Sequence, residues 1–183
     1  MKELRKVSQE ELREILELHE LWLESNGKEG EVANLSYCDL RYAKLKDADL
    51  RYANLTHADL TNANLRYCDL THADLTHADL TNANLRDVKL IHADLRCVDL
   101  NYCDLRDADL SYCDLSYAEL TNADLGNANL TSADLANAKL FCAKVDNMVG
   151  LVNIGNENRT VYYFYKEDRV ICGCFDNTLE DFK

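Results

Sequence analysis

Charged side chains recur every 20 residues in the central part of this chain. One such series is acidic and consists of Asp39, Asp59, Asp79, Asp99 and Glu119. A second series is basic and consists of Lys46, Arg66, Arg86 and Arg106. Because strips of like charge attract partners of the opposite charge, the acidic series is a candidate interaction face.

A third set of side chains belongs to the types that ligate zinc. Imidazole, thiolate and carboxylate groups recur at the same interval, at His57, His77 and Cys97, at His72 and His92, and at Asp74 and Asp94. No short zinc-binding spacing accompanies them. The sequence also lacks a phosphate-binding glycine loop, a serine–histidine–acid set and a distinct carboxylate pair. We therefore expect no enzyme activity, no catalytic residue and no cofactor.

These residues lie within a five-residue repeat. Leucine occupies every fifth position from Leu35 to Leu140, and Val145 continues the series. Two residues before each leucine stands a small apolar residue, mostly Ala, and the residue between them is mostly Asp or Asn. A period of five buries a single stripe neither on an α-helix nor on a β-strand. The chain must therefore turn once per repeat, so that the leucine and the small residue always point inward.

Residues 33–145 resemble the pentapeptide repeat family, whose motif centres on leucine with alanine two positions earlier and Asp or Asn between them. The resemblance implies an all-β solenoid, a right-handed quadrilateral β-helix in which four repeats close each coil of 20 residues. Positions 20 apart would then stack at a spacing of about 4.8 Å. The resemblance also implies one possible function, DNA mimicry like that of the gyrase-protecting, quinolone-resistance branch. The other hypothesis is a structural or protein-interaction scaffold.

On such a coil the acidic series becomes a ladder of stacked carboxylates, with the basic column on the adjacent face. Two charges at this spacing repel by about 0.9 kcal/mol in water and about 3.5 kcal/mol at an effective dielectric constant of 20. The ladder has two interpretations. Each carboxylate accepts nearby backbone N–H groups at a corner, or the ladder imitates a phosphate backbone. Pairing with the basic column would lower the repulsion and weaken the likeness to DNA.

The same stacking bears on the third set of side chains. Stacked coils hold histidine rings nearly parallel, whereas zinc requires ligands that converge tetrahedrally. We therefore expect stacked surface histidines and no metal site. The inward cysteines at positions 38, 68, 103 and 113 replace the small residue of the repeat on four different faces, which predicts buried thiols without disulfides. Outward tyrosines are candidate anchors for a protein partner, at positions 37, 42, 52, 67, 102, 112 and 117.

Both ends of a solenoid expose an apolar cross-section that must be covered. Ser8 and Glu11 form a capping box that begins an amphipathic helix over residues 9–25, with His19 as a partly buried residue of its apolar stripe. We expect an N-terminal helical cap at residues 1–30, the solenoid at 31–146, and a C-terminal β-hairpin at 147–183 that acts either as a cap or as a contact with a second copy or a partner. The ending VICGCFDNTLEDF, with a structural Cys172 and Cys174, is similar to tails of bacterial and phage pentapeptide repeat proteins.

The net charge of −13 narrows the possible partners. Such a chain repels nucleic acid and anionic membranes, so we expect no direct nucleic-acid binding and no membrane contact. The N-terminus is charged where a signal peptide would be apolar, which predicts a cytoplasmic protein. The sequence thus predicts a non-enzymatic scaffold, a monomer or homodimer, with an unknown protein partner; the alternative is an acidic DNA mimic that binds a nucleic-acid enzyme such as DNA gyrase.

Overall fold

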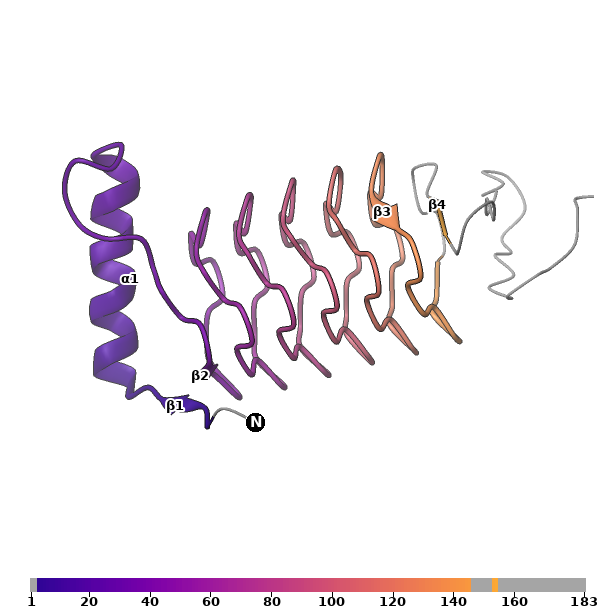
Figure 1. Cartoon of the computed structure of the whole chain (residues 1–183), viewed down its shortest axis with the longest axis horizontal. Coiled ribbons are helices and arrows are strands. Elements are labelled where there is room, and N and C mark those ends of the chain that lie inside the picture. The colour runs from indigo at the N-terminus through magenta and orange to yellow at the C-terminus, as the bar shows by residue number, and fades with distance from the viewer. Residues whose placement is uncertain (1–2, 146–152, 155–183) are drawn as a thin grey trace, which may run out of the picture.

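The computed structural model describes residues 3–145 and 153–154. One helix, α1, stands beside the first coil of a solenoid whose coils follow one another along the long axis of the molecule (Figure 1). Short strands pair at both ends of this stack. The elements in chain order are β1 (Arg5–Lys6), α1 (Gln9–Glu24), β2 (Cys38–Asp39), β3 (Asp134–Leu135) and β4 (Asn153–Ile154).

Parallel β-bridges join residues 20 apart on four sides of each coil. The first coil makes the bridges Asn34 with Asn54, Asp39 with Asp59, Lys44 with Asn64, and Asp49 with Asp69. The N–H of Leu35 donates to the carbonyl of Asn54 at 2.8 Å, and the N–H of Asn54 donates to the carbonyl of Ala33 at 2.9 Å. The same pattern continues to the bridge between Asp124 and Lys144. Four repeats therefore close one coil.

Each corner is a tight turn with one residue in the left-handed region of backbone space. At the first corner the N–H of Cys38 donates to the carbonyl of Leu35 at 3.2 Å, and Tyr37 has a φ of 56°. A φ between 56° and 64° recurs at every fifth residue up to Cys142, always without glycine. Asn, Asp and His adopt this conformation most readily among L-residues, and they fill many of these corners. The coil itself therefore imposes a conformation that Tyr and Cys do not favour locally.

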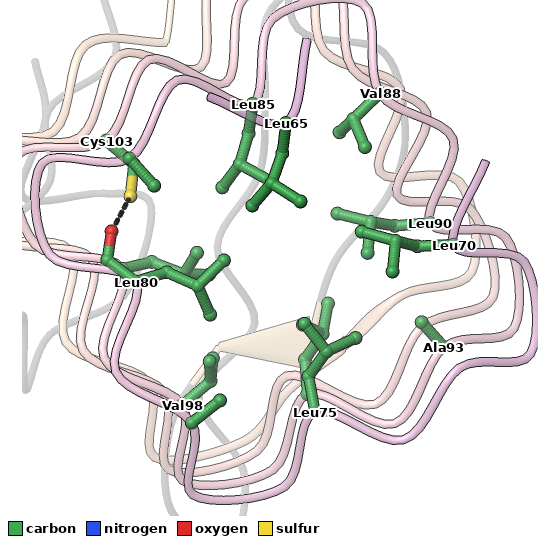
Figure 2. Packing of buried hydrophobic residues seen from close by; sticks show 14 of the residues in the cluster. Leu65, Leu70, Leu75, Leu80, Leu85, Val88, Leu90, Ala93, Val98 and Cys103 are labelled. Atoms are coloured by element: carbon green, nitrogen blue, oxygen red, sulfur yellow. Dashed lines mark hydrogen bonds between the residues drawn. The ribbon is translucent and has the colours of Figure 1, made fainter. Parts of the chain in front are cut away.

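The leucines of the repeat fill the interior from all four sides (Figure 2). Leu75 and Leu80 are 0% and 1% exposed, which confirms the predicted inward direction. The four inward cysteines are buried and free, also as predicted. The thiol of Cys103 donates to the carbonyl of Leu80 at 2.9 Å, and burial raises the pKa of this thiol to about 12. Burial also raises the pKa of the Cys68 and Cys113 thiols to about 12, so these three thiols are protonated packing residues. Cys172 and Cys174 lie outside the described residues.

The helix expected over residues 9–25 lies at Gln9–Glu24. Its first turn is capped by Ser8, whose Oγ accepts the N–H of Glu11 at 3.1 Å. The carboxylate of Glu11 forms an ion pair with Arg5 at 2.9 Å, which links the helix to β1. Past the helix, Asn26 and Gly27 both have positive φ and reverse the chain.

α1 packs against the first coil through its apolar stripe. Leu12 is buried, and Ile15 and Leu16 pack against the same core. The loop after the helix approaches α1 closely at Gly30, where an added Cβ would lie 2.1 Å from the carbonyl oxygen of Leu18. β1 pairs in parallel with β2 and so adds one more rung on one side of the first coil.

At the other end, β4 pairs in parallel with β3. Asp134 lies opposite Asn153, so the spacing here is 19 residues instead of the 20 found in the coils. β4 falls within the segment predicted to be a C-terminal cap. The rest of that segment, including the predicted hairpin at 160–165 and 169–175, lies outside the described residues.

Candidate interaction faces

The five carboxylates of the acidic ladder stack on one side of the solenoid, joined by bridges from Asp39 to Glu119. The structure adds a lysine at each end of this column: Lys6 of β1 pairs with Asp39, and Lys139 follows Glu119. Lys139 lies 20 residues after Glu119, so the repeat spacing could have revealed it. Lys6 precedes the repeats, and no spacing signal marks it.

The ladder aspartates also serve the local backbone. Oδ1 of Asp79 accepts the N–H of Thr81 at 2.9 Å, and Oδ1 of Asp99 accepts the N–H of Asn101 at 2.9 Å. Asn54 makes the same contact with the N–H of Thr56 at 3.0 Å. These contacts confirm the predicted corner role of Asp and Asn. The amide oxygen of Asn54 accepts the same backbone hydrogen bond as the carboxylates do, so the fold does not require negative charge at these positions.

At several places an arginine side chain lies between two carboxylates that are stacked on neighbouring coils. In three places the guanidinium bonds to the carboxylate two residues earlier and also approaches the carboxylate of the next coil. The contacts are Arg41 with Asp39 (2.7 Å) and Asp59 (3.6 Å), Arg96 with Asp94 (2.6 Å) and Asp114 (3.8 Å), and Arg106 with Asp104 (2.6 Å) and Asp124 (4.0 Å). Hydrogen bonds from these arginines hold the pKa of Asp39, Asp94 and Asp104 below the ordinary value. A guanidinium therefore fits across two stacked carboxylates.

In the part of the chain that the structure describes, no such cation lies at the middle of the ladder. Arg41 approaches Asp59, and Lys139 contacts Glu119 at 2.6 Å. Within residues 3–145, by contrast, Asp79 and Asp99 make no ion pair, because Thr81 and Asn101 occupy the positions that arginine holds elsewhere. We call these two stacked carboxylates the Asp79/Asp99 step.

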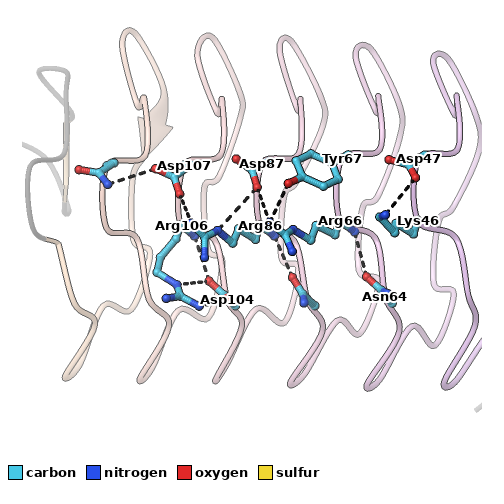
Figure 3. Close-up of polar contacts among 12 residues, drawn as sticks. Lys46, Asp47, Asn64, Arg66, Tyr67, Arg86, Asp87, Asp104, Arg106 and Asp107 are labelled. Atoms are coloured by element: carbon cyan, nitrogen blue, oxygen red, sulfur yellow. Dashed lines mark hydrogen bonds and ion pairs between the residues drawn. The ribbon is translucent and has the colours of Figure 1, made fainter.

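The basic column does not neutralise the ladder. Lys46 pairs with Asp47 at 3.4 Å, Arg66 with Asp87 at 3.4 Å, and Arg86 with Asp107 at 3.1 Å (Figure 3). In the described part of the chain no ion pair joins this column to the ladder. The described residues of the basic column therefore do not make the pairing that would lower the repulsion within the ladder. The physical reason is distance. One corner and one side of the coil separate the basic column from the ladder, whereas Asp47, Asp87 and Asp107 lie at the same corner as the basic side chains.

The histidines form two stacked columns at neighbouring corners. The rings of His57 and His77 lie 4.8 Å apart with an interplanar angle of 6°, and those of His72 and His92 lie 5.1 Å apart at 3°. Tyrosines extend both stacks, and Asp74 and Asp94 bridge on the side between them. Cys97 follows His77 and is exposed. Among the described residues no group of three or more potential ligands is placed to hold a metal ion.

Exposed tyrosines line several corners. Tyr42 and Tyr102 occupy one corner column and are 71% and 58% exposed, whereas Tyr52 stacks on His72. The predicted anchor tyrosines therefore differ in how much ring surface they offer to a partner, because the rings of some of them stack on other side chains of the same chain. Tyr102 and His77 stand at the two corners that border the side carrying the Asp79/Asp99 step.

Comparison with known proteins finds several similar solved structures. Among solved structures, the chain is similar to the pentapeptide repeat protein Rfr23 from the cyanobacterium Cyanothece 51142, with 35% identity over 54% of this chain and 64% of that chain and a TM-score of 0.29. The chain is also similar to alr5209, a pentapeptide repeat protein from Nostoc PCC 7120, with 28% identity over 70% of this chain and 84% of that chain and a TM-score of 0.34. A third similar structure is that of QnrB1, a plasmid-mediated fluoroquinolone resistance protein, with 18% identity over 62% of this chain and 77% of that chain and a TM-score of 0.38.

No curated protein matches the chain. Within residues 3–145 and 153–154, no helical segment has the length and hydrophobicity that a membrane span requires. The family of pentapeptide repeats matches with 8 copies at residues 33–66, 68–107 and 108–141. These ranges cover more than half of the sequence and coincide with the four-sided coils, so the chain belongs to the pentapeptide repeat family, whose fold is the right-handed β-helix.

Proposed function

We propose that this protein is a non-enzymatic scaffold that binds an arginine-bearing segment of a partner protein at the Asp79/Asp99 step. One observation supports this most directly. Arg41 lies across Asp39 and Asp59 in the same ladder, whereas the Asp79/Asp99 step has the same bridged backbone but pairs with no cation of residues 3–145. The chain's own arginine thus provides a template for the contact that a partner would make.

Electrostatics favours an external guanidinium at this step. Two stacked carboxylates repel by about 3.5 kcal/mol at an effective dielectric constant of 20, and a cation between them removes that cost. Arginine suits the position better than lysine because its planar fork can bond to both carboxylates. His77 and Tyr102 at the bordering corners offer aromatic surface for the same side chain or its neighbours. The net charge of −13 would also speed the approach of a basic partner.

Substitution of both carboxylates tests the proposal. In Asp79→Asn/Asp99→Asn, the amide oxygens still accept the backbone N–H groups, as Asn54 does, so we expect an intact fold. Titration with a short peptide that contains one arginine should shift the amide NMR signals of Thr81 and Asn101 in the wild type. We expect affinity to fall at least about tenfold in the double variant, which corresponds to about 1.4 kcal/mol.

The matched control is Asp74→Asn/Asp109→Asn. These aspartates also make no ion pair in the described part of the chain, but they lie on different sides of the coil and do not stack on each other. The control removes the same charge, so its affinity should stay close to that of the wild type. Equal losses in the two double variants would mean that net charge alone attracts the peptide, and the proposed site would be abandoned.

DNA mimicry directed at an enzyme such as gyrase is a second candidate function. The stacked carboxylates at 79 and 99 favour it, because they place negative charge at a regular spacing along one side. Lys6, Arg41 and Lys139 shorten this negative strip to the middle of the ladder. A supercoiling assay with and without a quinolone tests the idea, and no effect of added protein would remove it.

We also propose roles for the two ends. α1 would serve as the N-terminal cap, supported by the burial of Leu12 against the first coil. Residues 147–183 would cap the other end or provide a dimer contact, which leaves a monomer or a homodimer. A cytoplasmic location is part of the same proposal.

A further inference from the structure

His19 is completely buried between α1 and the first coil, with an exposure of 0%. Its Nδ1 accepts the backbone N–H of Ala33 at 3.1 Å, at the point where the chain enters the first coil. Its ring lies parallel to that of Trp22, with 6.0 Å between the ring centres. A ring nitrogen that accepts an N–H carries no proton. The docked position of α1 therefore requires the neutral imidazole.

The surroundings of His19 do little to stabilise the imidazolium form, in which both ring nitrogens carry a proton. Nε2 is buried and has no hydrogen-bond partner among the described residues. The charged groups that face the ring are Asp49 and Arg51 of the first coil. The carboxylate of Asp49 already accepts two hydrogen bonds from Arg51, at 2.8 and 2.7 Å. An imidazolium here would meet a carboxylate already paired and a guanidinium of its own sign. Burial lowers the pKa of His19, and the opposing effects of the Asp49 carboxylate and of the backbone oxygen of Arg51 are smaller.

We propose that His19 is a proton-sensitive latch whose protonation releases the N-terminal segment, β1 and α1, from the first coil while the remaining coils stay folded. Protonation turns Nδ1 into a donor that faces the N–H of Ala33, so the contact becomes repulsive. The other contacts between this segment and the first coil are the apolar stripe around Leu12, the two-residue pairing of β1, the hydrogen bonds from Arg5 to Sγ of Cys38, and the edge contact of Trp22 with Tyr52. Because each coil contacts only its neighbours, one end of a solenoid can open independently of the rest.

The direction of the pH effect follows from proton binding in the two states. Released His19 titrates near its ordinary pKa of 6.5, whereas the docked residue titrates at lower pH. The released state therefore binds more protons below that pH, and the docked state loses stability as the pH falls. The latch is fully effective above about pH 6.5 and weakens toward the docked pKa. Within this window the released population rises up to about tenfold per pH unit.

Trp22 provides a direct readout because it is the one tryptophan of the chain and stacks on His19. We expect its emission maximum to move to longer wavelength between pH 7.5 and pH 5, while the circular dichroism of the coils stays unchanged. Ordinary Asp and Glu side chains titrate below this range. In His19→Gln the amide oxygen can still accept the N–H of Ala33 without taking a proton, so the shift should vanish. His77→Gln, an exposed histidine of the coils, should keep it.

Hydrogen exchange of the wild type gives a test that does not depend on any variant. After correction for intrinsic exchange rates, the opening population of the α1 amides should rise with falling pH, and the logarithm of that population should approach a slope of −1. Coil amides between Leu60 and Leu100 should show no such slope. A flat profile for α1, or an equal emission shift in His19→Gln, would overturn the latch.

Discussion

Replacement of Leu80 with alanine is expected to lower the free energy of unfolding by about 2–5 kcal/mol. Leu80 is 1% exposed and points into the middle of the solenoid (Figure 2). Its N–H donates to the carbonyl of Asp99 at 2.8 Å, and its carbonyl accepts the thiol of Cys103 at 2.9 Å. Because backbone bonds to the next coil fix the rung, the walls cannot collapse into the space that the side chain leaves. The loss should therefore fall in the upper part of this range.

Thr81→Ala is the matched control for this measurement. Thr81 is the next residue along the chain, and its backbone N–H, which bonds to Asp79, is unchanged by the substitution. Chemical denaturation followed by circular dichroism should show a change within about 0.5 kcal/mol, as for most surface substitutions. Similar losses in the two variants would show that Leu80 is not an interior residue.

Replacement of Gly30 with alanine is expected to push α1 and the loop that follows it apart, and so to loosen the packing of α1. Gly30 has a φ of 72°, and an added Cβ would lie 2.1 Å from the carbonyl oxygen of Leu18 and 2.6 Å from the backbone nitrogen of Trp22. Both atoms belong to the helix backbone, so the clash is relieved only if the helix or the loop moves. The positive φ alone costs a non-glycine residue about 1–3 kcal/mol. Amide hydrogen exchange of α1 should accelerate, with the coils unaffected.

Gly27→Ala separates the two causes. Gly27 also has a positive φ, 79°, but an added Cβ would meet only the side chain of Trp22, at 3.3 Å. This variant carries the backbone strain without the clash against α1, so its exchange should accelerate less. If both variants protected α1 as well as the wild type does, the close docking of the loop on the helix would be refuted.

The repeat made much of the fold predictable. The five-residue spacing of leucine required a corner in every repeat, and the burial of Leu75 and Leu80 follows from that requirement alone. The spacing did not determine how many repeats close a coil. That number came from the family resemblance, and the bridge between Asp39 and Asp59 agrees with it.

The charges of the candidate site were only partly predictable. The stacking of the acidic ladder followed from the period, but its lysine from β1 lies outside the repeats and reaches Asp39 only through strand pairing. The partners of the basic column depend on which side chains share a corner, so Arg66 contacts Asp87 and not the ladder. Tyr37 gives no local signal of its positive φ, because the closed coil imposes it.

His19 shows the same limit. The amphipathic stripe predicted that it faces the solenoid, and it does, but the sequence indicated partial burial. Complete burial depends on the loop after α1, which returns along the helix and places the N–H of Ala33 against the ring. Contacts made by such a loop have no period, so no pattern in the sequence reveals them.

Disulfide crosslinking tests most directly whether 20 residues close one coil. In a background with serine at the exposed Cys97 and Cys142 and at Cys172 and Cys174, cysteines would be placed at exposed corner positions. Asn62→Cys/Asn82→Cys should oxidise to an intramolecular disulfide, because stacked positions lie about 4.8 Å apart, within the Cα range of disulfides. Asn62→Cys/His77→Cys should not, since these residues occupy different corners. Crosslinking of the second pair but not the first would contradict the four-sided coil and the Asp79/Asp99 step that depends on it.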